Sequence, residues 1–203
     1  MLRTPAPLTG DVRFLYDLEK AVILETLLDD ATAARAHFHF WWSLRHIALP
    51  EFHRTMNHFS YVDFFHASNA GHYKLIFIAL AQIFDRSNGA TGIKKLAAQL
   101  RQNGRPQDAI LIDDILTQYA DQIGSVLAIR NKSIGHNETA TPRHQVYRDN
   151  PIAPDQIREL IDAVCSLLNL ISERAGSTTR IAEPGRYESA VMALLKRLRD
   201  GET

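Results

Sequence analysis

The sequence predicts an all-α protein, a helical bundle of about four or five long helices plus short helices. Along most of the chain, apolar residues recur every three or four positions, which is the spacing of a helix that buries one face. No stretch of any length alternates apolar and polar residues as a half-buried strand would. Prolines, glycines and asparagines gather between the periodic segments, as is typical of connections in a bundle.

The composition is that of one globular domain, or of one domain with an appended element. The 203 residues are 45% hydrophobic and 23% charged, which suffices to build a core. The formal net charge is zero, so overall charge does not indicate a nucleic-acid or membrane partner. Because Met1 to Pro5 lacks the apolar core of a signal peptide, and the apolar run Leu75 to Phe84 is too short to span a bilayer, we expect a soluble, cytoplasmic protein.

The N-terminal third begins with a segment unsuited to a helix. Residues 1–10 contain two prolines and a glycine, and we expect a loose arm. Thr9 or Asp11 would cap the first helix, whose apolar spacing continues until the neighbourhood of Pro50.

Three helices are expected in the following sixty residues. The second helix occupies about 51–66, and Ser68-Asn69-Ala70-Gly71 predicts a break before a third helix at 71–86. The third helix is the most apolar, so we place it centrally. A short helix at 92–101 follows the turn signal Ser87-Asn88-Gly89.

The second half of the chain predicts three further helices and two loops. Pro106 stands at a favoured first-turn position for a helix over 106–134. Residues 137–153 have almost no apolar periodicity and read as a loop, and Pro154 opens a clean amphipathic helix.

The chain therefore divides into an arm, a bundle and an appended part. The bundle covers residues 11–175. Residues 176–203 form a loop to Gly185 and an amphipathic helix over 186–199, which we expect to pack on the bundle.

The stretch from Ile129 to Glu138 concentrates the groups that could carry chemistry. An apolar stripe at helical spacing leads into it: Ile112, Ile115, Leu116, Tyr119, Ile123, Val126 and Leu127. The next position of the stripe holds Arg130. A charge on an apolar face is costly unless it is paired or meets an anion or a partner chain.

Arg130 and His136 together suit phosphodiester cleavage without a metal. Arginine forms a fork for a phosphate, and histidine accepts and donates protons near neutral pH. On an unbroken helix the two side chains would stand about 120° apart, but Gly135 can loosen the last turn. The alternative is that both residues only stabilise the dipole at a helix C-terminus.

A second feature is a segment rich in histidine and aromatic residues over 37–72. Seven of the nine histidines lie in it: His37, His39, His46, His53, His58, His66 and His72. No pair has the i, i+4 spacing of a helical metal site and few carboxylates are near, so we predict no metal. The remaining interpretations are aromatics at helix interfaces or a partner surface around Trp41 and Trp42. The single cysteine, Cys165, excludes an internal disulfide and is expected to be buried.

The stretch Arg130-Asn131, five intervening residues, then His136 resembles the signature of the HEPN superfamily of all-α nucleotide-binding domains. The order of elements is similar to the branch associated with abortive phage infection. A helix closes with Leu80 to Arg86, a short helix follows, and Ile129-Arg130-Asn131-Lys132 ends a later helix. The resemblance covers about residues 11–175, and Gly135 stands where alanine looks commoner in that branch.

The resemblance implies a metal-independent endoribonuclease without a cofactor, acting in phage defence or as a toxin. It implies a symmetric homodimer with one composite cleft and leaves room for an antitoxin or regulatory protein. Arg130 would bind the scissile phosphate, His136 would transfer protons and Asn131 would orient one of them. Contacts to the RNA backbone would come from Lys132, Arg143 and Arg148.

Two other functions remain open from the sequence. One is a catalytically silent HEPN scaffold that binds RNA or protein, in which the motif holds the dimer together. The other is a helical interaction protein that works through segment 37–72 and has no nucleic-acid role. Zero net charge fits the last of these slightly better than a strong RNA binder.

Overall fold

The computed structural model describes residues 11–85, 91–135 and 142–201, and the expected N-terminal arm, residues 1–10, lies outside them. All regular structure in the described ranges is helical, so the predicted all-α fold is confirmed. None of the helices found there is both long enough and apolar enough to cross a bilayer.

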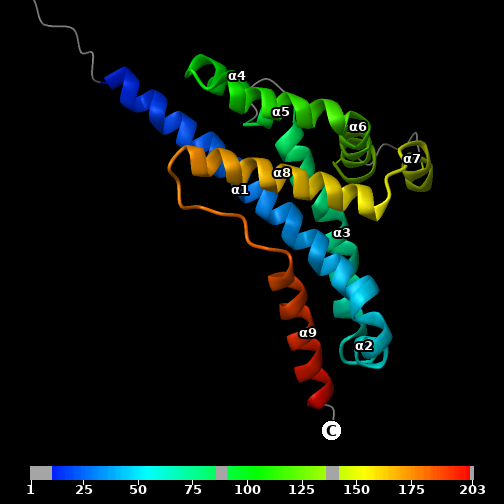
Figure 1. Ribbon diagram of the computed structural model, residues 1–203. Coiled ribbons are helices and arrows are strands. Elements are labelled where there is room, and N and C mark those ends of the chain that lie inside the picture. Colours follow the sequence, from blue (N-terminus) through cyan, green and yellow to red (C-terminus); the bar gives the residue numbers. More distant parts are fainter. Residues whose placement is uncertain (1–10, 86–90, 136–141, 202–203) are drawn as a thin grey trace, which may run out of the picture.

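Two long antiparallel helices and one that crosses them form the centre of the molecule (Figure 1). These are α1 (Asp11–Trp42), α3 (Val62–Phe84) and α8 (Pro154–Arg174). Their facing stripes supply the core, including the fully buried side chains Leu27, Phe38, Ile76, Phe77, Leu80, Leu160 and Leu168. The helical spacing of these residues is what allows each helix to bury one continuous face.

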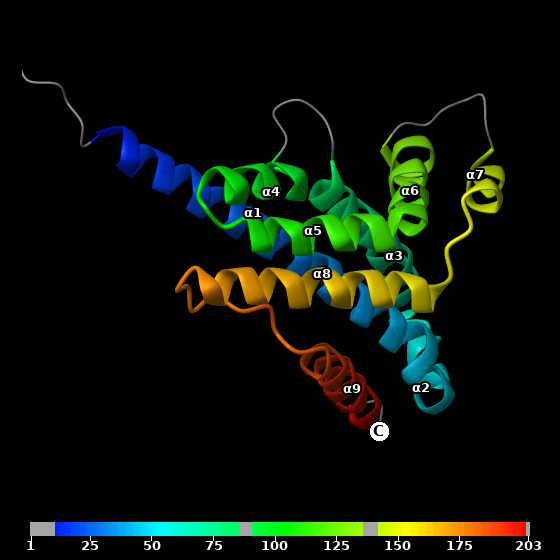
Figure 2. The ribbon, with the colours of Figure 1, turned by 45° about the horizontal axis from the view of Figure 1, so that its top comes forward.

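Four shorter helices cover one end of this centre. They are α4 (Ile93–Gln102), α5 (Pro106–Gln118), α6 (Ala120–Ile129) and α7 (Arg143–Asp149). Figure 2 shows α4, α5 and α8 side by side, with α6 and α7 at the far end of this layer.

The start of α8 is fixed by local chemistry. Pro154 occupies the first turn, where its missing N–H costs no hydrogen bond. The Ala153 N–H donates to the Gln156 side-chain oxygen at 2.8 Å, which satisfies one of the free donors at this helix end.

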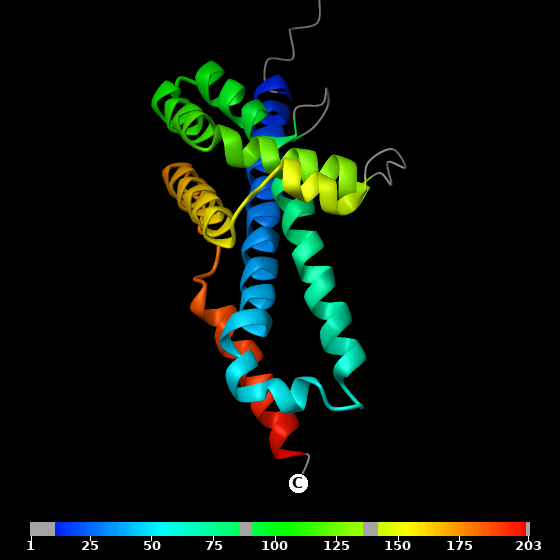
Figure 3. The same cartoon turned by 90° about the vertical axis from the view of Figure 1, so that its right-hand side faces the viewer.

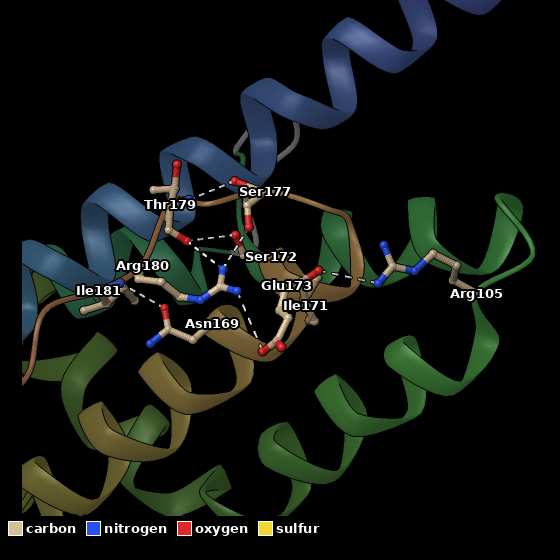
Figure 4. A network of polar contacts seen from close by, with 9 residues as sticks. All are labelled: Arg105, Asn169, Ile171, Ser172, Glu173, Ser177, Thr179, Arg180 and Ile181. Atoms are coloured by element: carbon tan, nitrogen blue, oxygen red, sulfur yellow. Dashed lines mark hydrogen bonds and ion pairs between the residues drawn. The ribbon is translucent and has the colours of Figure 1, made fainter.

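The chain after α8 returns along the molecule through a turn held by polar contacts (Figure 4). Gly176 has φ of 77°, a conformation that favours glycine. The Ser172 hydroxyl donates to the Thr179 carbonyl at 3.1 Å, and the Ile181 N–H donates to Asn169 Oδ1 at 2.9 Å. These bonds position residues 177–181 along the helix that they have just left.

The last helix, α9 (Gly185–Asp200), packs on the lower part of α1 and on α2 (Leu49–Met56). A second apolar cluster joins them: Leu44, Ala48, Phe52, Met56, Phe65, Val191 and Leu195. Polar contacts add to it, since buried His39 lies 3.2 Å from Glu188 and Arg35 donates to the Ala182 carbonyl at 3.2 Å. The segment thus contacts the bundle through both apolar and polar groups.

The predicted break at Ser68 to Gly71 is wrong, because α3 continues through it. α3 buries Phe65 in the second apolar cluster on one side of this stretch, and Ile76 and Phe77 in the main core on the other. This packing outweighs the weak helix propensity of the Ser-Asn-Ala-Gly stretch. Gly71 needs no special conformation, and open space surrounds the position of a Cβ there.

The predicted single helix over 106–134 is divided, and the predicted loop over 137–153 contains α7. Tyr119 has φ of −107° and ψ of 24°, which ends α5 and lets α6 start in a new direction. α6 then passes into a π-helical segment, η2 (Arg130–Gly135). A second π-helical segment, η1 (Ser43–Ile47), joins α1 to α2. A regular helical period cannot reveal such wide turns.

Candidate functional site

Arg130 lies at the point where α6 changes into η2. Ile129, the last residue of α6, is fully buried, and η2 packs on α3 and α7. A π-helical turn places hydrogen bonds five residues apart instead of four, and such turns are frequent at functional sites. The apolar stripe therefore anchors α6 up to Ile129, and the polar residues begin where the helix widens.

The Arg130 side chain is half-buried and makes one hydrogen bond to a side chain of the described residues. Its Nη1 donates to Asn131 Oδ1 at 2.8 Å. Among the described residues, no carboxylate pairs with Arg130. Within the described part of the chain, its charge is thus oriented by a neutral amide, and a guanidinium has further N–H groups with which it can bind an anion.

The other residues of η2 divide into two that pack on the protein and two that face solvent. Ser133 is buried and Ile134 packs on the main core, whereas Asn131 and Lys132 are exposed. The segment therefore exposes Asn131 and Lys132 to solvent, while Ser133 and Ile134 hold its backbone against the protein.

The other predicted site residues are placed less completely. His136 lies outside the described residues, so its distance from Arg130 stays a prediction. Arg143 begins α7, but its side chain lies outside the described part, and Arg148 is exposed on the same helix. The structure thus brings exposed Lys132 and Arg148 onto neighbouring elements, η2 and α7.

An open hollow of about 620 Å³ lies beside the end of α6. It is lined by Tyr73, Ile129, Tyr147, Asn150, Pro151, Ile152, Ala153 and Gln156. The Tyr73 and Tyr147 rings lie 6.2 Å apart. Burial, and then the neighbouring Tyr147, raises the pKa of Tyr73 to about 12, so its hydroxyl stays protonated at neutral pH and can donate a hydrogen bond.

The sequence did not reveal the residues of this hollow as site candidates. Tyr73 belongs to α3 and Tyr147 to α7, and only the tertiary fold brings them together. Tyr147 also lies in a stretch expected to be a loop. The available signal was the aromatic residue between the basic pair Arg143 and Arg148.

Most of the histidine and aromatic segment is used in packing. Trp42 lies over the His46 ring at 4.0 Å and under the Arg158 guanidinium at 4.5 Å. His37 and His72 approach with their Nδ1 atoms 2.9 Å apart. Within the described ranges, no three His, Cys, Asp or Glu side chains lie close enough to hold a metal ion.

Comparison with known proteins gives one match. The HEPN_AbiU2 family model, described as AbiU2, matches residues 19–193. The match covers most of the chain, from within α1 to within α9. The chain matches no curated protein and no solved structure.

Proposed function

Because the chain belongs to the AbiU2 family of HEPN domains, in the abortive-infection branch of that superfamily, we propose that it is a metal-independent endoribonuclease. We place its work in phage defence, or as a toxin restrained by a partner protein. Family membership and the Arg130-Asn131 pair support this proposal, and the observation that carries it is the guanidinium of Arg130, which no carboxylate among the described residues neutralises.

The proposed reaction needs one cation and one proton-transfer group. His136 removes the proton of a ribose 2′-hydroxyl, and the 2′-oxygen forms a bond to the neighbouring phosphorus. The bond from phosphorus to the 5′-oxygen breaks, and that oxygen leaves with a proton. Arg130 stabilises the charge that builds on the phosphate oxygens, and the products carry a 2′,3′-cyclic phosphate and a 5′-hydroxyl.

Asn131 and the exposed cations have supporting roles in this proposal. The amide oxygen of Asn131 orients Arg130, which reduces the entropy lost when the phosphate binds. Lys132, Arg143 and Arg148 contact backbone phosphates of the RNA.

We further propose that the active form is a homodimer with two-fold symmetry. Two copies of η2 would then face one cleft, and one phosphate would meet groups from both chains. An arginine at the end of an apolar stripe is consistent with this arrangement, because the stripe's end would become a subunit interface.

The test is incubation of the purified protein with mixed RNA in EDTA, followed by end-group analysis of the fragments. Wild type should produce 2′,3′-cyclic phosphates, whereas Arg130→Ala and His136→Ala should cleave at least about 100-fold more slowly. His144→Ala is the matched control, because His144 is an exposed histidine on α7. Cleavage that survives in both variants, or that requires an added metal, refutes the proposal.

A further inference from the structure

Three hollows on the described surface follow one another from the end of α6 and share lining residues, and we call the three together the trough. The hollow beside Ile129 shares Tyr73 and Ile152 with a second hollow of about 430 Å³ between α1, α3 and the start of α8. The second hollow shares Arg45, His66 and Asn69 with a third of about 280 Å³ between η1, α2 and α3. Figure 3 shows the elements concerned, with α3 beside α1, α7 near one end of α3 and α2 at the other.

The trough has an electrostatic character that favours a polyanion. None of the described residues that line the three hollows is an aspartate or a glutamate. Arg45 is exposed on its wall, and no ion pair engages it within the described residues. Exposed Lys132 and Arg148 stand on η2 and α7, the elements at the other end. A chain of phosphates would meet positive charge at both ends and no carboxylate between them.

Three aromatic side chains with adjacent rings lie along the middle of the trough. Trp41 lies 5.2 Å from Tyr73, and Tyr73 lies 6.2 Å from Tyr147, measured between ring centroids. All three side chains are half-buried, so each is held in place and keeps part of its surface open. Proteins that bind single strands combine such rings, on which bases stack, with a basic groove that follows the backbone.

A polar acceptor without a partner lies next to these rings. The Asn69 Oδ1 atom is buried and has no hydrogen-bond partner among the described residues, although it borders two of the hollows. An unbonded buried oxygen is costly, and a ligand N–H or O–H would relieve this cost. A base edge and a ribose hydroxyl both carry such donors.

One π-helical segment contributes to the trough directly, and the other begins beside it. η1 supplies Arg45, and the hollow at the other end is lined by Ile129, the residue that precedes η2. Such wide turns are frequent at functional sites.

We propose that this trough binds a single-stranded stretch of the RNA that flanks the scissile phosphate. Bases stack on Trp41, Tyr73 and Tyr147, and the backbone contacts Arg45. This assignment rests on the ribonuclease function proposed above and adds its substrate class, which is unpaired RNA. A duplex would not fit, because its bases are already stacked and their faces are covered.

The first test measures binding without cleavage. The probe is a short, fluorescein-labelled single-stranded RNA of mixed sequence with 2′-O-methyl groups, which cannot supply the attacking hydroxyl. Arg45→Glu and the double variant Arg45→Glu/His66→Ala should weaken binding about tenfold or more in fluorescence anisotropy at fixed salt. Arg45 and His66 are both exposed, so the fold should tolerate these changes.

The matched control is Arg186→Glu, which makes the same charge change at an exposed position of α9 away from the trough. It should change binding by less than about twofold. Equal weakening by Arg45→Glu and Arg186→Glu, or no weakening by either, overturns the proposal. Duplex RNA that competes fully with the probe also overturns the proposal. An Arg45→Glu protein that loses its dimer but still binds the RNA does so as well.

The second test reports stacking directly. The chain has two tryptophans, so Trp42→Phe leaves Trp41 as the only indole. Saturation with the unlabelled methylated RNA should quench Trp41 fluorescence, and unchanged emission at saturation argues against stacking there.

The two proposals fail in different ways. Arg45→Glu should raise KM and leave kcat unchanged, whereas Arg130→Ala should lower kcat. Binding that depends on Arg45 in a protein that cleaves nothing retains the trough and removes the nuclease. Cleavage by wild type with no effect of Arg45→Glu on KM or on binding retains the nuclease and removes the trough.

Discussion

Arg130 and Asp108 are charged side chains near helix ends, and they differ in whether their hydrogen-bond partners carry the opposite charge. Asp108 is buried and accepts hydrogen bonds from Arg105 at 2.6 Å and from Arg174 at 2.5 Å. Arg130 is bonded to the neutral amide of Asn131. The first arrangement neutralises its charges within the fold, whereas no carboxylate among the described residues neutralises Arg130.

Replacement of Asn131 should test whether orientation of Arg130 matters. Asn131→Ala removes the 2.8 Å hydrogen bond, and we expect kcat for RNA cleavage to fall about tenfold. Asn131→Asp should reduce it further, because a carboxylate would compete with the phosphate for Arg130. Thermal unfolding of both variants should match wild type, since Asn131 is exposed, and a lower Tm with unchanged kcat would mean a structural role only.

Replacement of Asp108 should cost stability. Asp108→Ala leaves two arginines without their carboxylate, and we expect a loss of about 2–3 kcal/mol in the free energy of unfolding, measured in urea. Asp155→Asn is the control, since the exposed Asp155 lies 3.4 Å from Arg158 and its loss should cost less than about 0.5 kcal/mol. Equal costs would contradict the assignment.

The pH dependence of this cluster has a definite sign. Burial by itself raises the pKa of Asp108, but the hydrogen bonds from Arg174 and Arg105 outweigh it, and the net shift is below the ordinary value of 3.8. The stabilisation is therefore present above pH 3.8 and is lost as the pH falls through the lowered pKa.

At the scale of helices, the sequence predicts the long amphipathic segments well and their irregular joints poorly. α8 begins at Pro154 as expected, because a proline and an apolar period are local signals. The continuity of α3 through Asn69 and Gly71 depends on packing against α1, which no local pattern contains. The π-helical turns that hold Arg45 and Arg130 likewise leave no mark in the regular helical period of the sequence.

The same distinction applies to the candidate site. Arg130, Asn131 and Lys132 are consecutive, so their chemistry is visible in the sequence. Tyr73, Tyr147 and Arg45 come from α3, α7 and η1, and their proximity appears only when these elements are assembled.

Two neighbouring leucines can measure how α9 is attached. Leu195 is fully buried against α2 and η1, whereas Leu194 is 47% exposed. Leu195→Ala should cost about 2–4 kcal/mol and make α9 sensitive to limited proteolysis. Leu194→Ala should cost less than about 1 kcal/mol, and equal effects would mean that α9 does not depend on this cluster.

For the molecule as a whole, three half-buried or buried histidines link stability to pH. Burial lowers the pKa of His37, and His72 lowers it further. Burial also lowers the pKa values of His72 and of His39, where Glu188 only partly opposes the effect. Each favours its neutral form in the folded chain.

The sign of this effect follows from proton binding. Below the ordinary histidine pKa of 6.5, the unfolded chain binds more protons than the folded one, so stability falls as the pH drops from 7 toward 5. We expect Tm to decrease by several degrees over this range. The double variant His37→Gln/His72→Gln should show a shallower decrease, and an unchanged slope would exclude the pair as its source.

Asp30 should respond in the opposite direction. Burial, and then the adjacent Asp29, raises the pKa of Asp30 to about 6, so its contribution to stability is lost as the pH rises toward neutrality. Asp30→Asn should therefore raise the free energy of unfolding at pH 7 by about 1 kcal/mol, a value reduced for the part of the carboxyl that stays in water. Exposed Asp29→Asn should have a smaller effect, and a lower Tm in Asp30→Asn would contradict this reasoning.

Cys165 is buried between α8 and α1, with its thiol 3.7 Å from the Ala31 carbonyl, and burial raises the pKa of that thiol to about 12. As the chain's single cysteine, it makes the folded protein inert toward thiol reagents. The rate at which a thiol reagent labels Cys165 consequently measures how often α8 separates from α1. Because Cys165 does not react in the folded protein, a spin label introduced at Lys132→Cys would be the only label on each chain. The distance between two such labels would then report how two chains face each other.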